Sequence, residues 1–371
     1  MIYLDNAATG GRKPDTVLTA HASAVKVCAN PGRAGHKLAL ITAKRVEDCR
    51  NALSAFFDGY GAERTVFTKN CTEALNIALF GTLRKGDHII VSPLEHNSVL
   101  RPLHRLKSLG VITYEVCSLT NGTISPENIL PLLRPNTRLV AVTLASNVTG
   151  ATPDISAIKA VLPPHVLLLC DGAQAGGHFP VSMQKTGIDL LTVAGHKGLL
   201  GVQGSGALLF SDRINPAPLL YGGTGSVSVS LDMPDFYPDA LEAGTLSFPA
   251  ITALGEGVRY LSLKQNEITQ KLSFLTDYCI ERARRLPNYK LFSHPNPCGI
   301  VAIKHRLRDS EEVADILSER YDIAVRGGLH CAPLAHKALQ TFPEGLVRAS
   351  FSHYTSAADI DEFIYALSEI R

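Results

Sequence analysis

The sequence predicts an α/β protein whose larger part is built on a mostly parallel sheet and whose remainder is a smaller α+β domain. Short apolar runs of strand length alternate with segments of helical period over the first two-thirds of the chain. Parallel strands that follow one another need helical crossovers of this kind. The length of 371 residues also suits two domains, at roughly 150 residues per domain.

Seven apolar runs are predicted to form the large sheet, at residues 64–67, 88–92, 112–116, 138–144, 166–170, 189–193 and 206–210. One helical pattern precedes the first run, at residues 43–57, and others lie between runs, at residues 72–83, 98–108 and 153–162. Because right-handed crossovers make parallel strands end at one edge of a sheet, functional loops are expected at that edge.

The second part of the chain begins after about residue 249. A long helical pattern runs to residue 285, and shorter strands follow at residues 299–304 and 346–351. Ser356 and Asp359 have the spacing of a capping box at the start of a final helix. Residues 221–238, rich in Gly, Ser and Pro, are predicted to form a long loop. We therefore predict a large domain of residues 15–250 and a small domain of residues 1–14 and 251–371.

The composition excludes several classes of protein. Hydrophobic residues make up 45% and charged residues 19% of the chain, and 36 basic against 34 acidic side chains leave a net charge of +2. These values argue against intrinsic disorder and against a general polyanion binder, so no nucleic-acid partner is expected. The apolar runs are far shorter than the roughly 18 residues of a membrane-spanning helix, and the N-terminus lacks a secretory pattern. A cytoplasmic protein without a membrane partner is expected.

Eight cysteines are spread along the chain, at positions 28, 49, 71, 117, 170, 279, 298 and 331. Neither their density nor their spacing is typical of a disulfide framework or a zinc ribbon. Most should be reduced and buried, and this applies above all to Cys49, in a helical pattern, and Cys170, at the end of an apolar run.

A carboxylate and an amine follow two of the predicted strands. Asp171 comes directly after the run at residues 166–170, and Lys197 follows the run at residues 189–193. A return to the same sheet edge would bring both groups to one pocket, where desolvation would lower the pKa of the lysine and favour its nucleophilic form. Taken alone, Asp171 could be a helix cap and Lys197 a solvated surface charge.

Two further motifs raise the question of a phosphate site. The glycine-spaced loop at residues 198–206 leads into a strand and not into a helix, which argues against a dinucleotide fingerprint. Thr72 lies where a helix is predicted to begin, so its hydroxyl, the free backbone N–H groups and the positive helix end could hold a phosphate. The alternative is that Thr72 only caps the helix.

The order and spacing of the motifs, from Tyr3 to Arg348, resemble those of class V aminotransferase-fold enzymes, specifically the cysteine desulfurase and selenocysteine lyase branch. The resemblance covers essentially the whole chain. It implies the fold type I of enzymes that depend on pyridoxal 5′-phosphate (PLP), with a seven-stranded, mostly parallel sheet. It also implies a homodimer.

The same resemblance implies a role for each residue of the cofactor site. Lys197 matches the residue that holds the coenzyme as a Schiff base, and Asp171 the carboxylate that pairs with its pyridine nitrogen. A buried carboxylate there keeps the ring protonated, which makes the ring an electron sink. Gln174 matches the partner of the phenolic oxygen, and His96 the imidazole that stacks on the ring and moves protons. The remaining cofactor-binding residues would be Cys71, Thr72 and His196 and, across a dimer interface, Gly244 and Thr245.

Cys331 distinguishes the desulfurase branch from transaminases. Glycines and Pro333 flank it, which predicts a loop and not a core position. The resemblance makes its thiol the nucleophile that accepts the substrate sulfur as a persulfide. The thiolate is the reactive form, and nearby cations such as His330 or Arg326 would favour it. A metal site of His330, Cys331 and His336 is the alternative, but it lacks a fourth ligand, so no metal is expected.

Arg348 matches the arginine that holds the substrate carboxylate, for which its planar fork is suited. Asn147, Arg326 and His36 are the other predicted substrate-binding residues. The interval of 348 − 331 = 17 residues between Cys331 and Arg348 resembles the compact cysteine loop of the group II desulfurases. Ala194 departs from the family pattern, because related enzymes usually carry a serine there that donates to the phosphate.

We therefore predict a PLP-dependent cysteine desulfurase that converts L-cysteine to L-alanine. The sulfur of the substrate would pass to Cys331 and then to a thiol or a sulfur-acceptor protein. Selenocysteine lyase is the nearest alternative, because a selenol leaves more readily than a thiol. Transamination, β-lysis of cystine and racemisation need no sulfur-accepting cysteine, and a scaffold protein without catalysis needs none of these residues.

Overall fold

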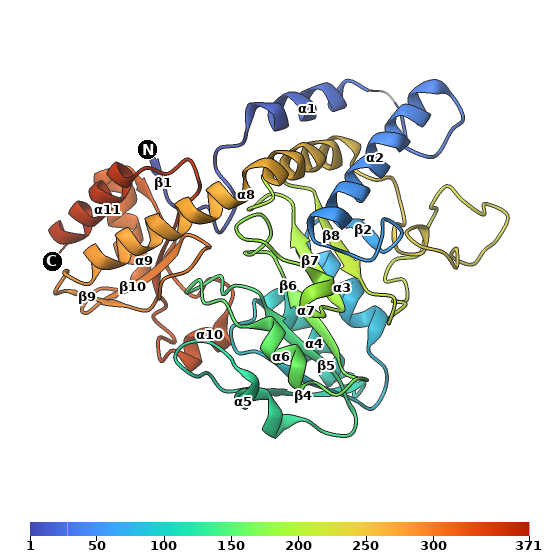
Figure 1. Cartoon of the computed structure of the whole chain (residues 1–371). Coiled ribbons are helices and arrows are strands. Elements are labelled where there is room, and N and C mark those ends of the chain that lie inside the picture. The colour runs from blue at the N-terminus through green and yellow to red at the C-terminus, as the bar shows by residue number, and fades with distance from the viewer. Residues whose placement is uncertain (28, 371) are drawn as a thin grey trace.

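The computed structural model describes residues 1–27 and 29–370, and its larger part is built on one sheet (Figure 1). The sheet has the strand order β2-β8-β7-β6-β5-β3-β4. Its strands are β2 (Thr65–Thr68), β3 (Asp87–Val91), β4 (Ile112–Val116), β5 (Thr137–Thr143), β6 (Leu167–Asp171), β7 (Leu190–Ala194) and β8 (Gly206–Phe210). The strand β8 runs opposite to the other six strands and pairs antiparallel with both β2 and β7. The predicted seven-stranded, mostly parallel sheet is confirmed.

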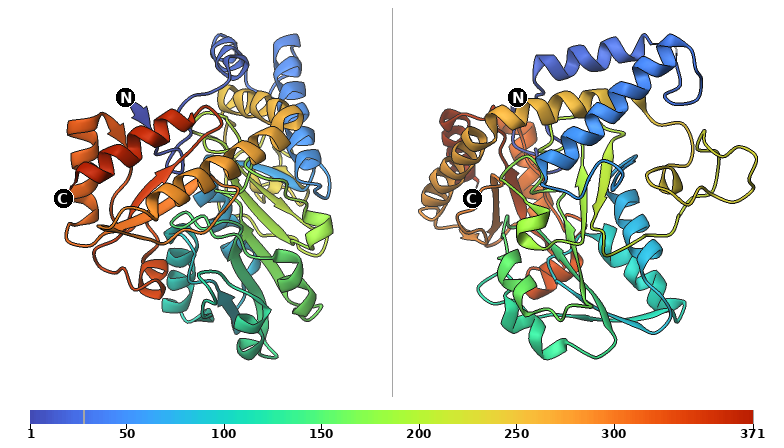
Figure 2. Two further views of the ribbon diagram at one scale, coloured as in Figure 1. Left: turned by 60° about the vertical axis from the view of Figure 1, so that its left-hand side comes forward. Right: turned by 45° about the vertical axis from the view of Figure 1, so that its right-hand side comes forward.

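Helices cover both faces of this sheet, which is why its inner strands, such as β6 and β7, are buried along their whole length (Figures 1 and 2). On β6, Leu167 and Leu169 belong to one core, and Leu168 and Cys170 belong to the other. The first core includes side chains of α3 (Cys71–Thr82) and α4 (Asn97–Ser108). The second includes side chains of α2 (Lys37–Phe56), α6 (Ile155–Val161), α7 (Met183–Thr186) and α8 (Phe248–Ala283).

The helix α2 begins six residues before the predicted start at residue 43. The His36 side chain caps it by accepting a hydrogen bond of 3.3 Å from the backbone N–H of Ala39. Leu38, Leu40 and Ile41 in its first turns are exposed. Because these residues do not follow a buried stripe, the periodicity of the sequence does not reveal that part of the helix.

The smaller part of the molecule lies beyond the far end of α8, which continues from the large sheet to it (Figures 1 and 2). An antiparallel sheet of order β12-β10-β9 consists of β9 (Tyr289–Leu291), β10 (Ile300–His305) and β12 (Val347–Ser350). The helices here are α9 (Ser310–Tyr321), α10 (Pro333–Ala338) and α11 (Ala357–Glu369). The predicted capping box of Ser356 and Asp359 is present at the start of α11.

The first residues of the chain lie against this smaller part. The strand β1 (Ile2–Tyr3) pairs in parallel with β11 (Ile323–Ala324), and Asp5 forms a bridge to Ser350 of β12. The chain then crosses to α1 (Asp15–Val25), which lies along α8 (Figure 1). The N-terminal segment therefore passes between the two sheets.

The remaining elements are short. They are α5 (Pro126–Ile129), η1 (Leu130–Leu132) and η2 (Asp239–Leu241). Residues 221–238 form the predicted long loop, which stands away from the sheet at the right of Figure 1. Within residues 1–27 and 29–370, no helix combines the length and the apolar character needed to cross a bilayer.

Candidate active site

A cavity of about 250 Å³ lies at the carboxyl ends of the central strands of the large sheet. The last residues of β5, β6 and β7 line it, as expected for an α/β sheet. Arg326 and Arg348 close it from the smaller part of the molecule. The predicted site residues that line this cavity are Cys71, Thr72, His96, Asn147, Asp171, Gln174, His196, Lys197, Arg326 and Arg348.

Asp171 and Cys71 form a buried wall of this cavity. Asp171 ends β6, and its Oδ1 accepts a hydrogen bond of 2.9 Å from the backbone N–H of Ala173. The Sγ of Cys71 lies 3.6 Å from the same carboxylate oxygen and 3.4 Å from the hydroxyl of Thr192. Burial, and then the charge of Asp171, raise the pKa of the Cys71 thiol well above its ordinary value. Cys71 is therefore a protonated thiol beside a buried carboxylate.

Lys197 reaches the same cavity from the loop that follows β7. The loop begins at Gly195. A Cβ atom at this position would collide with the Ser205 hydroxyl, so no larger residue fits without a rearrangement. Burial lowers the pKa of the Lys197 amine, and the charge of Asp171 partly opposes this shift. A lowered pKa increases the fraction of neutral, nucleophilic amine, which Schiff-base chemistry requires.

His96 precedes α4 and caps it. Its Nδ1 accepts a hydrogen bond of 3.1 Å from the backbone N–H of Ser98 and lies 2.8 Å from the Ser98 hydroxyl. Because a backbone N–H only donates, Nδ1 carries no proton, and the neutral ring is protonated at Nε2. Burial lowers the pKa of His96 to about 4, with Asp171 opposing the shift and Lys197 adding to it.

The Ser98 hydroxyl is a site residue that the sequence analysis missed. It lies 2.8 Å from the Thr72 hydroxyl and, like Ala194, lines the cavity. Thr72 and Ser98 each lie in the first turn of a helix, α3 and α4, so both helices point their positive ends to this region. The only sequence signal was a serine two residues after a histidine at the start of a predicted helix.

The N-terminal segment supplies another part of the cavity wall. Gln174 Nε2 donates a hydrogen bond of 2.9 Å to the carbonyl of Ala7, while its Oε1 is buried without a partner in the described residues. The carbonyl of His196 accepts hydrogen bonds from the Gly10 N–H (3.0 Å) and from Lys13 Nζ (2.8 Å). These contacts fix the backbone next to Lys197.

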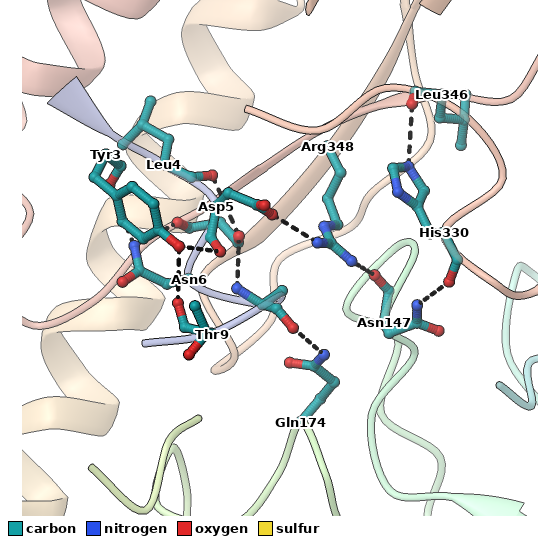
Figure 3. Close-up of polar contacts among 12 residues, drawn as sticks. Tyr3, Leu4, Asp5, Asn6, Thr9, Asn147, Gln174, His330, Leu346 and Arg348 are labelled. Atoms are coloured by element: carbon teal, nitrogen blue, oxygen red, sulfur yellow. Dashed lines mark hydrogen bonds and ion pairs between the residues drawn. The ribbon is translucent and has the colours of Figure 1, made fainter. Parts of the chain in front are cut away.

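Arg348 lies on β12 with a side chain that is only 1% exposed. Its Nη2 donates to Asp5 Oδ1 at 2.8 Å and its Nη1 to the carbonyl of Asn147 at 2.9 Å (Figure 3). The Nε of Arg348 has no partner among the described residues. Asn147 Nδ2 donates in turn to the carbonyl of His330 at 2.8 Å (Figure 3).

Cys331 is exposed and lies on the loop before α10. Its carbonyl accepts a hydrogen bond of 2.7 Å from the N–H of Asn97, the residue after His96. His330, the residue before it, lines the cavity, although Cys331 itself does not. Both residues have left-handed backbones, with φ angles of 50° and 56°. The thiol is thus carried by an exposed turn that is held against the edge of the site.

One expectation about this loop is wrong. His330 was expected to be a cation beside the thiol, but its ring is buried and its Nε2 lies 3.0 Å from the carbonyl of Leu346 (Figure 3). Burial, reinforced by Arg348, lowers the pKa of His330 to about 2, so the ring is neutral. Of the two cations expected to favour the thiolate of Cys331, His330 and Arg326, only Arg326 remains a candidate.

The alternative metal site finds no support in the geometry. The rings of His330 and His336 are 5.8 Å apart between centroids, and His336 Nδ1 lies 2.8 Å from the Thr341 hydroxyl. Within residues 1–27 and 29–370, no group of three or more His, Cys, Asp or Glu side chains has metal-binding geometry.

Besides Cys331, three predicted site residues do not line the cavity of this chain. His36 caps α2, Gly244 lines a different hollow that also includes Arg33 and Glu242, and Thr245 Oγ1 accepts a hydrogen bond of 3.3 Å from Asn30. Among the described cysteines, those buried are Cys49, Cys71, Cys117, Cys170, Cys279 and Cys298. This confirms burial for Cys49 and Cys170, and Cys28 lies outside the described residues.

The family model of class V aminotransferases, described as "Aminotransferase class-V", matches residues 2–363. The match spans all three sheets and every residue that lines the cavity. The chain therefore belongs to the class V aminotransferase family.

Named relatives narrow this assignment. The chain is 32% identical over 379 residues to a probable cysteine desulfurase of Methanothermobacter thermautotrophicus, covering 100% of this chain and 94% of the relative. It is 31% identical to a cysteine desulfurase of Escherichia coli K12, covering 100% and 93%. The apo structure of a cysteine desulfurase from Thermococcus onnurineus NA1 has a TM-score of 0.89 at 28% identity, with coverage of 100% and 94%. Within its family, the chain is thus a member of the cysteine desulfurases, as its motifs indicate.

Proposed function

We propose that this enzyme binds PLP and converts L-cysteine to L-alanine, with transfer of the substrate sulfur to Cys331. The observation that carries the proposal is the convergence of groups at one cavity. An amine of lowered pKa, a buried carboxylate and a buried guanidinium face it, and an exposed thiol lies on the turn at its edge.

The residues present fit the coenzyme. Gln174 Oε1 is a buried acceptor without a partner in the described residues, as expected of a group that awaits a ligand hydroxyl. Asp171 would hold the ring nitrogen, and Thr72 and His196 the phosphate, with Cys71 beside the carboxylate. When bound, PLP supplies the electron sink for a carbanion at the substrate Cα.

The chain's own residues would then perform three tasks. Arg348 holds the α-carboxylate of the substrate, with Asn147 and Arg326 beside it. Lys197 and the Nε2 of His96 hold and move protons near the Cα. Cys331 attacks the substrate sulfur as a thiolate, so that an S–S bond forms and the Cβ–S bond breaks. The electron pair stays with the carbon skeleton, which takes up a proton to become alanine.

The test is product analysis with L-cysteine as the substrate. We expect alanine and enzyme-bound persulfide in equal amounts in the first turnover, and continued alanine release only when a thiol such as dithiothreitol removes the persulfide. Pyruvate and free sulfide without bound persulfide would contradict the proposal, since they would indicate β-lysis. The same assay with L-selenocysteine compares the two chalcogens.

We further propose that the active enzyme is a homodimer. Thr72 is exposed at the phosphate end of the cavity, while His36, Gly244 and Thr245 lie elsewhere on the same chain. Apolar side chains are exposed near these segments, including Leu38, Leu40, Val229 and Leu231. A second copy that covers them would bring its Gly244 and Thr245 to the open end. Light scattering that shows a fully active monomer would contradict this arrangement.

Three further parts of the proposal concern the chain and the cell. We propose a large domain of residues 15–250 and a small domain of residues 1–14 and 251–371. We also propose a cytoplasmic location and delivery of the sulfur to a thiol or an acceptor protein. Limited proteolysis, cell fractionation and capture of sulfur-35 on a partner would test these points in turn.

A further inference from the structure

The buried guanidinium of Arg348 needs more than its own strand to hold it in place. A long side chain with several rotatable bonds has many orientations, and a carboxylate binds in two-point fashion only when the guanidinium plane is set correctly. Two contacts set it here, from Asp5 Oδ1 and from the Asn147 carbonyl (Figure 3). In the described residues, Asp5 is the carboxylate that forms an ion pair with Arg348.

Asp5 is itself fixed by its neighbours in the backbone. Its carbonyl accepts a hydrogen bond of 3.1 Å from the Tyr3 hydroxyl (Figure 3). It forms a parallel bridge to Ser350, two residues beyond Arg348 on β12. The N–H of Asn6 also donates to the carbonyl of Ser350, at 3.3 Å. The paired backbones of the N-terminal segment and of β12 thus hold the side chains of Asp5 and Arg348 close together.

The same N-terminal segment is also attached to the opposite side of the cavity. Ala7 accepts the hydrogen bond of Gln174, while Gly10 and Lys13 donate to the carbonyl of His196. The chain from Asp5 to Lys13 therefore connects the guanidinium with the loop that carries Lys197. A displacement of Arg348 would alter the distance between its guanidinium and the Lys197 amine. A substrate amino acid must span this distance when it binds.

Free donors remain on the guanidinium after these contacts. Of its five N–H groups, Asp5 and Asn147 each take one, and Nε has no partner in residues 1–27 and 29–370. We propose that Asp5 is a positioning residue for substrate recognition, which orients Arg348 so that its remaining N–H groups receive the α-carboxylate. This inference rests on the proposed function, because it assumes an amino-acid substrate.

The test compares Asp5→Ala and Asp5→Asn with the unchanged holoenzyme. In Asp5→Ala we expect the KM for L-cysteine to rise about 10- to 100-fold, the effect of losing a hydrogen bond between charged groups, with kcat changed less than about 3-fold. Asp5→Asn should lose less, because its amide oxygen still accepts from Nη2. An unchanged KM in both variants would overturn the inference.

Binding measurements separate orientation of Arg348 from a general structural effect. The probes are L-alanine and L-alaninamide, and the second of these lacks the carboxylate. Binding of each probe is measured by the change in the absorption of the coenzyme. We expect Asp5→Ala to weaken binding of L-alanine and to leave that of L-alaninamide within about 2-fold, since only the carboxylate contacts Arg348. Equal weakening of both probes would overturn the inference.

Two controls complete the experiment. Asp322→Asn removes an exposed ion pair with the terminal ammonium of Met1 at the same end of the molecule. This variant should bind L-alanine and L-alaninamide as the unchanged enzyme does. In an Arg348→Ala background, Asp5→Ala should add little, because Asp5 acts through Arg348. Additive losses would overturn the inference. Failure of the unchanged protein to bind PLP would instead overturn the proposed function.

Discussion

Cys71 and Cys331 lie at the same site but in opposite surroundings. Cys71 is buried at the carboxyl edge of the large sheet, 3.6 Å from Asp171, and burial keeps its thiol protonated. Cys331 lies on an exposed turn next to the smaller sheet, held by the N–H of Asn97. The thiol within contact of the buried carboxylate is therefore the inert one. Access and a polar environment, and not proximity to the carboxylate, favour a nucleophilic cysteine.

The two regions also differ in how rigidly they are built. Asp171 ends one fully buried parallel strand and the loop of Lys197 follows the next, so the hydrogen bonds of the sheet hold both groups in place. The Cys331 turn has two left-handed residues. It is held by hydrogen bonds to the carbonyls of His330 and Cys331 and by the contact of the His330 ring with the carbonyl of Leu346. A rigid wall suits a coenzyme that must stay in one position. A turn at the surface suits a sulfur that must leave for an acceptor.

The largest expected effect follows from removing the amine of Lys197, which is proposed both to bind the coenzyme and to move protons. Lys197→Ala should abolish the absorption band of lysine-bound coenzyme and lower alanine formation by about 10⁴-fold or more, because no other described amine lines the cavity. Absorption spectroscopy and a turnover assay check it. A variant that keeps the band would mean that another residue binds the coenzyme.

The next prediction tests the comparison of the two thiols directly. Cys331→Ser should keep the coenzyme band but lower persulfide and alanine formation by about 10³-fold or more, since a hydroxyl is a far weaker nucleophile. Cys71→Ser should instead affect mainly the coenzyme, through its contact with Asp171. If Cys71→Ser were the variant that lost persulfide formation, the assignment of the two thiols would be reversed.

Chemical modification should show a smaller but direct contrast. Iodoacetamide should alkylate Cys331 at least about 10-fold faster than any of the six buried cysteines described, because the thiols of those residues are enclosed. Peptide mass spectrometry after short exposure measures the rates. Equal labelling of Cys331 and Cys71 would show that the cavity wall opens in solution.

The smallest expected effect concerns the acid stability of the site. Burial lowers the pKa of His96 from 6.5 to about 4. As the pH falls through this window, the unfolded chain binds a proton that the folded chain does not, so stability decreases. His96→Asn, which keeps a helix-capping residue, should reduce the slope by at most about 1.4 kcal/mol per pH unit. Urea unfolding at several pH values checks it, and an unchanged slope would mean that His96 is protonated in the folded state.

Much of the fold could be predicted because the information is local. The inner strands of the large sheet are apolar runs of a few residues, and the capping box at Ser356 is contained within four residues. The start of α2 could not be predicted, since its first apolar residues are exposed. The residues of the site could likewise be predicted only where a local sequence pattern marks them. Asp171 and Lys197 were found because each follows an apolar run, whereas Ser98 had no comparable signal.

The sequence by itself determined the alternation of strands and helices and the chemical groups at their ends, because periodicity and residue type are properties of short segments. Only the tertiary structure decided which of these groups meet. Asp5 pairs with Arg348 across 343 residues of chain, and His330 loses its expected charge because distant segments bury its ring. Burial and ion pairing depend on neighbours in space, which local patterns do not specify.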